Sequence, residues 1–264
     1  KPGKRYISRR RSNSPQYLKE VFEGIFERFR NLPPGKLQDS TWLKENMPYT
    51  GELLMGHLRY GTHGVNTIET CHPFLRQNNW ISRNLVVAGN FNLTNVDELF
   101  EELVTLGQYP KEKSDTVTVM EKIGHFLDDE VHRLHAFNKT ENISTEELND
   151  LIIRNVNVQR VLERASKKFD GGYVMGGMIG HGDAFMMRDP NGIRPAYFFQ
   201  DEEVVVMASE RPAIQTAFDV HFSKVQELQP GHALIIKRDG AIDEKRFVPQ
   251  AERKSCSFER IYFS

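Results

Sequence analysis

The chain has 264 residues, of which 39% are hydrophobic and 27% charged, a composition that supports a folded core and excludes global disorder. Its formal net charge of −1 gives no excess of basic side chains, so neither nucleic acid nor a membrane surface is an expected partner. Two distant cysteines, Cys71 and Cys256, predict no disulfide framework and no metal site, and a reducing, cytoplasmic setting is expected.

The first third of the chain predicts one helix and two strands. Ser14-Pro15 is typical of a helix N-terminus, and apolar residues then recur at helical spacing from Leu18 to Phe29. Strands are predicted over residues 51–60 and 84–88, where apolar residues cluster before segments rich in glycine or asparagine.

The middle of the chain predicts helices with recognisable ends. The sequence from Asn95 resembles a capping box, and Gly107 is a suitable stop for the helix that follows. Ser114 is the expected cap of the next helix. Ser144 begins a second capping box and opens a helical stretch that continues to about residue 168.

After Asp170 the sequence changes to short apolar segments separated by Gly, Asp, Asn and Pro, which predict strands and tight turns. Strands, then helices, then many strands favour a layered α+β fold with antiparallel sheets. Residues 1–264 are interpreted as one domain. Its basic start and its apolar, aromatic last residues indicate that it is part of a longer protein.

Four segments could carry chemistry, and each has a plainer structural explanation. In "GHLRYGTHG", Arg59 could grip a carboxylate or a phosphate, or it could be a surface arginine. In "AGNFNLTN", residues 88–95, asparagine and backbone N–H groups at a strand-to-helix turn could form an oxyanion hole, or only a turn and a cap. Asp115 could hold an ammonium group or interact with the helix dipole. "RDPNGIRPAYFF", residues 188–199, fits a structural hairpin better than a site.

Other common sites have no support in the sequence. The nine histidines show no spacing typical of a metal site. No glycine-rich phosphate loop is present, and no serine sits in a nucleophile elbow.

Taken together, the segments are more specific than any one of them. The sequence resembles, from about Gly51 to its last residue, the glutamine amidotransferase domain of the glutamine phosphoribosylpyrophosphate amidotransferases. The resemblance rests on these segments in this order: GHLRYGTHG, HPF, GNFNLTN, SDT, DGGY, RDPNGIRP, ASER, LQPGHAL and CSFERIYFS.

The resemblance implies an N-terminal nucleophile hydrolase fold, which is a four-layer αββα sandwich of two antiparallel sheets with helices outside. It also implies an enzyme in which an N-terminal cysteine attacks the side-chain amide of glutamine, releasing ammonia and then glutamate. The ammonia would be transferred to phosphoribosyl pyrophosphate in purine synthesis. No cofactor is expected in this domain, and Mg²⁺ only with a phosphoribosyltransferase domain that these residues do not include. The full-length protein is expected to be a homo-oligomer.

The resemblance also assigns residues to the substrate. Arg59 matches the arginine that holds the α-carboxylate of glutamine, within a segment where Tyr60 and Thr62 also line the substrate site. Asp115 matches the aspartate that holds the α-ammonium. These two charges would select a free amino acid over a peptide.

The oxyanion hole matches Asn90 and the backbone N–H of Phe91, and here the sequence departs from the family pattern. The usual turn is Asn-Gly-Asn, and phenylalanine tolerates a positive φ poorly. Lys1 is not a cysteine, so the nucleophile and the first strands of the fold are expected upstream, and the 264 residues alone are expected to be inactive. Two alternatives stay open: a non-catalytic glutamine-binding or regulatory domain, and another class II amidotransferase or amide hydrolase.

Overall fold

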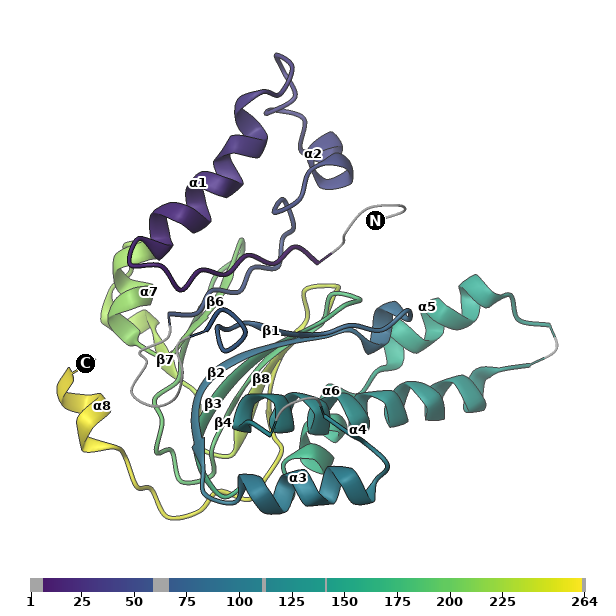
Figure 1. Cartoon of the computed structure of the whole chain (residues 1–264), viewed down its shortest axis with the longest axis vertical. Coiled ribbons are helices and arrows are strands. Elements are labelled where there is room, and N and C mark those ends of the chain that lie inside the picture. The colour runs from purple at the N-terminus through teal and green to yellow at the C-terminus, as the bar shows by residue number, and fades with distance from the viewer. Residues whose placement is uncertain (1–6, 59–66, 111–112, 141, 263–264) are drawn as a thin grey trace. The chain divides into compact units, whose positions relative to one another are not determined.

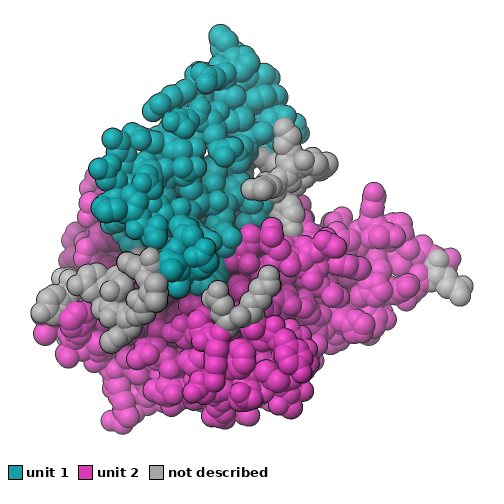
Figure 2. Space-filling view, viewed as in Figure 1, with its two compact units in different colours: residues 1–74 teal, residues 75–264 magenta. Residues whose placement is uncertain are grey.

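The computed structural model describes residues 7–58, 67–110, 113–140 and 142–262. By its internal contacts the chain divides into two compact units, residues 1–74 and residues 75–264, coloured separately in Figure 2. Among the described residues, no helix is both long enough and apolar enough to cross a membrane.

The described residues of the smaller unit form two helices, α1 (Tyr17–Arg30) and α2 (Ser40–Asn46), as Figure 1 shows. The helix predicted after Ser14 is confirmed as α1. Ser14 lies just before it and accepts a hydrogen bond from the backbone N–H of Gln16 at 3.0 Å.

The strand predicted over residues 51–60 is wrong for the part that the structure describes. Residues 51–58 form no strand, and residues 59 and 60 lie outside the described residues. The side chains of Leu54 and Leu58, which suggested a buried strand face, are 78% and 69% exposed. An apolar pattern becomes a strand only where a partner strand and a covering layer exist, and the pattern alone does not supply them.

The larger unit contains a six-stranded sheet in the order β1-β2-β3-β4-β8-β9. The pairs from β2 to β9 are antiparallel. The strands are β1 (Phe74–Arg76), β2 (Leu85–Leu93), β3 (Gly171–Ile179), β4 (Ala184–Arg188), β8 (His232–Ile236) and β9 (Ile242–Arg246).

A second, three-stranded antiparallel sheet has the order β6-β5-β7. Its strands are β5 (Tyr197–Gln200), β6 (Val205–Ala208) and β7 (Gln226–Glu227). The short strands predicted after Asp170 are therefore all present, and the prediction of an α+β fold with antiparallel sheets is confirmed.

Apolar side chains of both sheets share one buried core, so the two sheets pack face to face. The large sheet contributes Val174, Met186 and Leu234 from β3, β4 and β8. The small sheet contributes Phe198 from β5, and Ala196 and Leu228, which flank β5 and β7 in the chain, complete the cluster. A second core fills the space between the small sheet and helix α7 (Arg211–Phe218) and contains Phe199, Ile214 and Val225.

Helices cover the other face of the large sheet, where α4 packs on β2 and α6 on β8 (Figure 1). The helices of this layer are α3 (Val96–Thr105), α4 (Asp115–Asn138), α5 (Thr145–Asn155) and α6 (Val158–Ala165). A short helix α8 (Ser257–Tyr262) and two 3-10 turns, at Ile81–Arg83 and Phe222–Lys224, complete the unit.

Most of the predicted helix ends are confirmed. Ser114 accepts a hydrogen bond from Val117 N, the capping box at Ser144 is formed, and Gly107 has a φ of +81° just after α3. The predicted capping box at Asn95 is wrong. The Asn95 side chain instead donates to the carbonyl of Lys168 at 2.7 Å, tying the start of α3 to the segment before β3.

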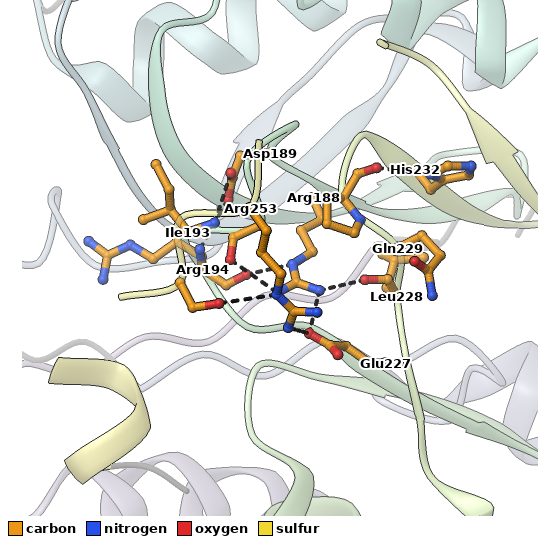
Figure 3. Close-up of polar contacts among 12 residues, drawn as sticks. Arg188, Asp189, Ile193, Arg194, Glu227, Leu228, Gln229, His232 and Arg253 are labelled. Carbon is orange, nitrogen blue, oxygen red and sulfur yellow. Dashed lines mark hydrogen bonds and ion pairs between the residues drawn. The ribbon is translucent and has the colours of Figure 1, made fainter. Parts of the chain in front are cut away.

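The hairpin predicted for the segment after β4 is wrong. This segment carries the chain from the large sheet into the small one, so β4 and β5 do not pair. Arg188, the last residue of β4, is 2% exposed. Its guanidinium donates to Glu227 at 2.8 Å and to the carbonyl of Leu228 at 2.6 Å, both at the end of β7 (Figure 3). It also donates to the carbonyls of Gly192 and Arg194. One buried side chain therefore links the two sheets and the turn between them.

The neighbouring Asp189 is fully buried and organises the same turn. Its carboxylate accepts backbone N–H groups of Asn191, Ile193 and Arg194 at 3.0, 2.9 and 3.0 Å. Each of these bonds gives a partner to a backbone donor in a partly buried turn. The predicted turn at Asp-Pro-Asn-Gly is thus confirmed, with a carboxylate at its centre.

Replacing Arg188 should destabilise the protein far more than replacing Arg253, although both donate to the same oxygen of Glu227. Arg188→Ala leaves Glu227 and several carbonyls without a buried donor, and we expect a loss of about 3–5 kcal/mol in the free energy of unfolding. Arg253 is 54% exposed, and Arg253→Ala should cost less than about 1 kcal/mol. Urea unfolding measures both, and equal losses would show that burial does not set the strength of this contact.

Candidate functional site

Asn90 and Phe91 lie inside β2, not in a turn between a strand and a helix as predicted. The strand continues to Leu93, and its register pairs Asn90 with Val174 and Phe91 with Tyr173 of β3. The polar residues that suggested a turn are accommodated because β3 supplies hydrogen bonds along the whole segment.

The pairing determines where the backbone of Phe91 points. Tyr173, its partner on β3, directs its backbone N–H and carbonyl away from β2 and toward Asp189. Its carbonyl accepts from Asp189 N at 2.8 Å, and its N–H faces the Asp189 carboxylate. In an antiparallel pair the two residues either exchange both hydrogen bonds or neither. The N–H of Phe91 therefore points away from β3.

The backbone of Phe91 also carries no strain. Among the described residues, only Tyr49 and Asp219 have a positive φ without being glycine. Phe91 is in extended conformation, which any residue adopts. The absence of glycine at this position therefore does not distort the backbone, contrary to the expectation from sequence.

The side chain of Asn90 faces the space between the two sheets. Residues directly opposite on paired strands share a face, and Val174 belongs to the core that both sheets build. On the same face, two residues along, Gly172 lies under Ile193 of the 188–194 turn, and a Cβ at Gly172 would approach Ile193 Cγ2 to 2.7 Å. Asn90 thus lies beside the turn that Asp189 organises.

Asn90 has a charged partner from the other end of the chain. Its Nδ2 donates to Glu259 Oε1 on α8 at 2.9 Å, and Arg194 Nη1 forms an ion pair with the same oxygen. Glu259 is 4% exposed. The three side chains therefore form one chain of contacts, Asn90–Glu259–Arg194, that starts at β2 and ends at the turn between the sheets.

Tyr173, the residue paired with Phe91, is buried close to Asp189. Burial, and after it the charge of Asp189, raise the pKa of the Tyr173 phenol well above its ordinary value. Tyr173 is 1% exposed and stays neutral, so it adds bulk and no charge on the helix-facing side of β3.

Asp115 is the first residue of α4, as predicted. Its carboxylate accepts a hydrogen bond from the N–H of Thr116 at 2.8 Å and is partly exposed. A negative charge at this end of a helix is favoured by the helix dipole, so Asp115 places an anion where a cationic group could bind.

The remaining predicted residues, Arg59, Tyr60 and Thr62, lie outside the described residues. Their assignment to the substrate stays a prediction. Among the described residues, no group of three His, Cys, Asp or Glu side chains is arranged to hold a metal ion.

Sequence reasoning missed Glu259 and Arg194. The available signal was the charged dipeptide Glu259-Arg260 inside the otherwise apolar segment "SFERIYF", since a charged side chain among apolar residues is buried only when it is paired. Nothing in the sequence indicated that its partners were Asn90 and Arg194.

No family model matches the chain. Curated proteins do: it is 30% identical to the amidophosphoribosyltransferase of Archaeoglobus fulgidus over 215 residues, which are 81% of this chain and 40% of that protein. It is also 30% identical to that of Bacillus subtilis over 220 residues, or 38% of that protein. The chain thus spans about two fifths of the length of these relatives.

Solved structures agree with the sequence comparison. Glutamine phosphoribosylpyrophosphate amidotransferase from B. subtilis, complexed with ADP and GMP, matches with a TM-score of 0.51 and 28% identity over 79% of this chain and 38% of that one. A structure described as the allosteric regulatory enzyme of purine biosynthesis matches with a TM-score of 0.52 and 29% identity over the same shares of the two chains. The chain is therefore similar, in sequence and in fold, to one class of enzymes. These are the amidophosphoribosyltransferases.

Replacing Phe91 by glycine should lower stability without relieving any strain. Phe91→Gly removes a half-buried ring and adds backbone freedom to a strand, and we expect a loss of about 1–3 kcal/mol in the free energy of unfolding. Asn92→Gly, at an exposed position of the same strand, should cost about 0.5–1 kcal/mol. Denaturant unfolding compares them, and a stabilised Phe91→Gly variant would contradict the extended conformation.

Proposed function

We propose that this chain is the glutaminase part of an amidophosphoribosyltransferase-like enzyme, which hydrolyses glutamine to glutamate and ammonia. The observation that carries the proposal is the pair of neighbouring donors in β2, the Asn90 amide and the Phe91 N–H, in a chain similar to these amidotransferases. The face-to-face sheets with helices on both outer sides support an N-terminal nucleophile hydrolase sandwich.

The two donors suit the acyl-transfer chemistry of such an enzyme. A cysteine thiolate would attack the side-chain carbonyl carbon of glutamine, and the carbonyl oxygen would become an oxyanion. The Asn90 Nδ2–H and the Phe91 N–H would stabilise that charge, ammonia would leave after protonation, and water would release glutamate from the thioester. The cysteine is proposed to precede the 264 residues.

Two charges would select glutamine as a free amino acid. The carboxylate of Asp115, at the start of α4, is proposed to hold the α-ammonium. Arg59 is proposed to hold the α-carboxylate through a two-point contact, with Tyr60 and Thr62 beside it. Transfer of the ammonia to phosphoribosyl pyrophosphate, with Mg²⁺, would belong to a part of the enzyme outside these residues.

One observation favours a second candidate, a glutamine-binding domain without turnover. The hydrogen bond to Glu259 takes one of the two N–H groups of the Asn90 amide. If both were needed to hold substrate, glutamine would bind without efficient hydrolysis. The glutaminase remains the better supported function, because the amide retains its second N–H for an oxyanion.

Asn90→Ala in the full-length protein should lower kcat for glutamate release by about 10²–10³-fold with a nearly unchanged KM, because an oxyanion donor acts in the transition state. The assay starts with the intact mass and N-terminal sequence of the purified protein, which should reveal an N-terminal cysteine. Wild-type protein that binds glutamine without releasing glutamate would support the binding domain instead.

Asp115→Asn and Arg59→Ala should each raise KM for glutamine by about 10–100-fold with a small change in kcat. The reason is that each variant removes a charged contact that is made equally in the ground state and the transition state. Asparagine keeps an oxygen for the N–H of Thr116, and the helix cap at Ser114 is untouched. Asp97→Asn, which removes an acid from the first turn of α3, is the matched control and should leave KM unchanged. An unchanged KM in both test variants would remove these residues from the site.

A further inference from the structure

The least expected contact in the larger unit joins Glu259 to Asn90, which are separated by 169 positions in the sequence. A carboxylate oxygen accepts hydrogen bonds and cannot donate them, so the Asn90 amide must turn its nitrogen, not its oxygen, toward Glu259. The contact therefore selects one of the two orientations of the amide. In that orientation the second N–H of the same nitrogen is the one left for another acceptor.

Arg194 makes this arrangement compatible with a developing negative charge. An unpaired carboxylate next to an oxyanion would repel it. Arg194 forms an ion pair with the Glu259 oxygen that Asn90 contacts, and so neutralises the charge beside the amide. Arg194 is itself positioned by the Asp189 carboxylate, which accepts its backbone N–H at 3.0 Å.

The contact is poorly explained as a device for stability. The other carboxylate oxygen, Glu259 Oε2, is buried and accepts no hydrogen bond from the described residues, and the same holds for Arg194 Nε as a donor. An unsatisfied buried polar atom opposes folding. A short helix could be anchored by an apolar side chain without that cost, as the exchange of buried ion pairs for apolar residues illustrates.

We propose that Glu259, held by Arg194, is a positioning residue that orients the Asn90 amide as an oxyanion donor. This inference rests on the proposed glutaminase function and assigns to α8 a part in the reaction. Glu259 does not touch the reacting atoms; it acts through Asn90 alone. Its removal should therefore affect kcat, and only while Asn90 is present.

The test is a double-mutant cycle in the full-length protein with glutamate release as the assay. Glu259→Met replaces the carboxylate by a thioether that accepts hydrogen bonds only weakly. It should lower kcat about 10–30-fold and change KM by less than about 3-fold, a smaller loss of kcat than that expected for Asn90→Ala. Glu259→Gln still offers an oxygen to the amide and should lie between Met and wild type. In the Asn90→Ala background, Glu259→Met should change kcat by less than about 2-fold.

Controls separate positioning from folding. Ile261→Ala alters an exposed side chain of the same helix, 73% exposed, and should leave kcat unchanged. Glu259→Met leaves the Arg194 cation without its anion, so its melting temperature should fall, and kcat is therefore compared at a temperature at which circular dichroism shows every variant to be folded.

The outcomes distinguish the two claims. If Asn90→Ala lowers kcat while Glu259→Met does not, or if the two effects multiply in the double variant, the positioning role is wrong and the glutaminase function stands. If the wild-type protein releases no glutamate from glutamine, the proposed function fails, and the positioning role with it.

Discussion

The larger unit depends on the junction at Arg188 and Asp189. The guanidinium joins the end of β4 to the end of β7, and the carboxylate gathers the backbone N–H groups of the turn between them. Two sheets that pack through apolar side chains alone could slide over one another, since hydrophobic contacts have no direction. Charge-assisted hydrogen bonds have a preferred geometry, so this junction fixes the turn that carries Arg194.

The sequence predicted the second half of the fold well and the first part less well. After Asp170, turns rich in Gly, Asp, Asn and Pro mark nearly every strand end, so the strands could be located one by one. The predictions of a strand over residues 51–58 and of a turn at the end of β2 were wrong for a common reason. Whether a segment is a strand, and where it stops, is decided by its partner, and β3 lies about 80 residues away from β2 in the chain.

The candidate site shows the same division between local and distant information. Asp115 at the start of α4 follows from the cap at Ser114, a local signal. The importance of Asn90 could be proposed from its neighbours, but its contact with Glu259 could not, because no local rule pairs residues so far apart. The resemblance to amidophosphoribosyltransferases added candidate roles, and the geometry added that Phe91 is in an extended strand, where no glycine is required.

The buried position of Glu259 also has a practical meaning for anyone who trims the protein to a minimal domain. By its core alone, the unit could be cut after Phe247, the last buried apolar residue among those whose burial the structure describes. Such a truncation would discard α8 and leave the Arg194 cation facing an interior with no anion, the kind of uncompensated charge that invites water into a packed region. The boundary of the folding unit therefore lies beyond the last strand, at a helix whose buried carboxylate pairs with Arg194.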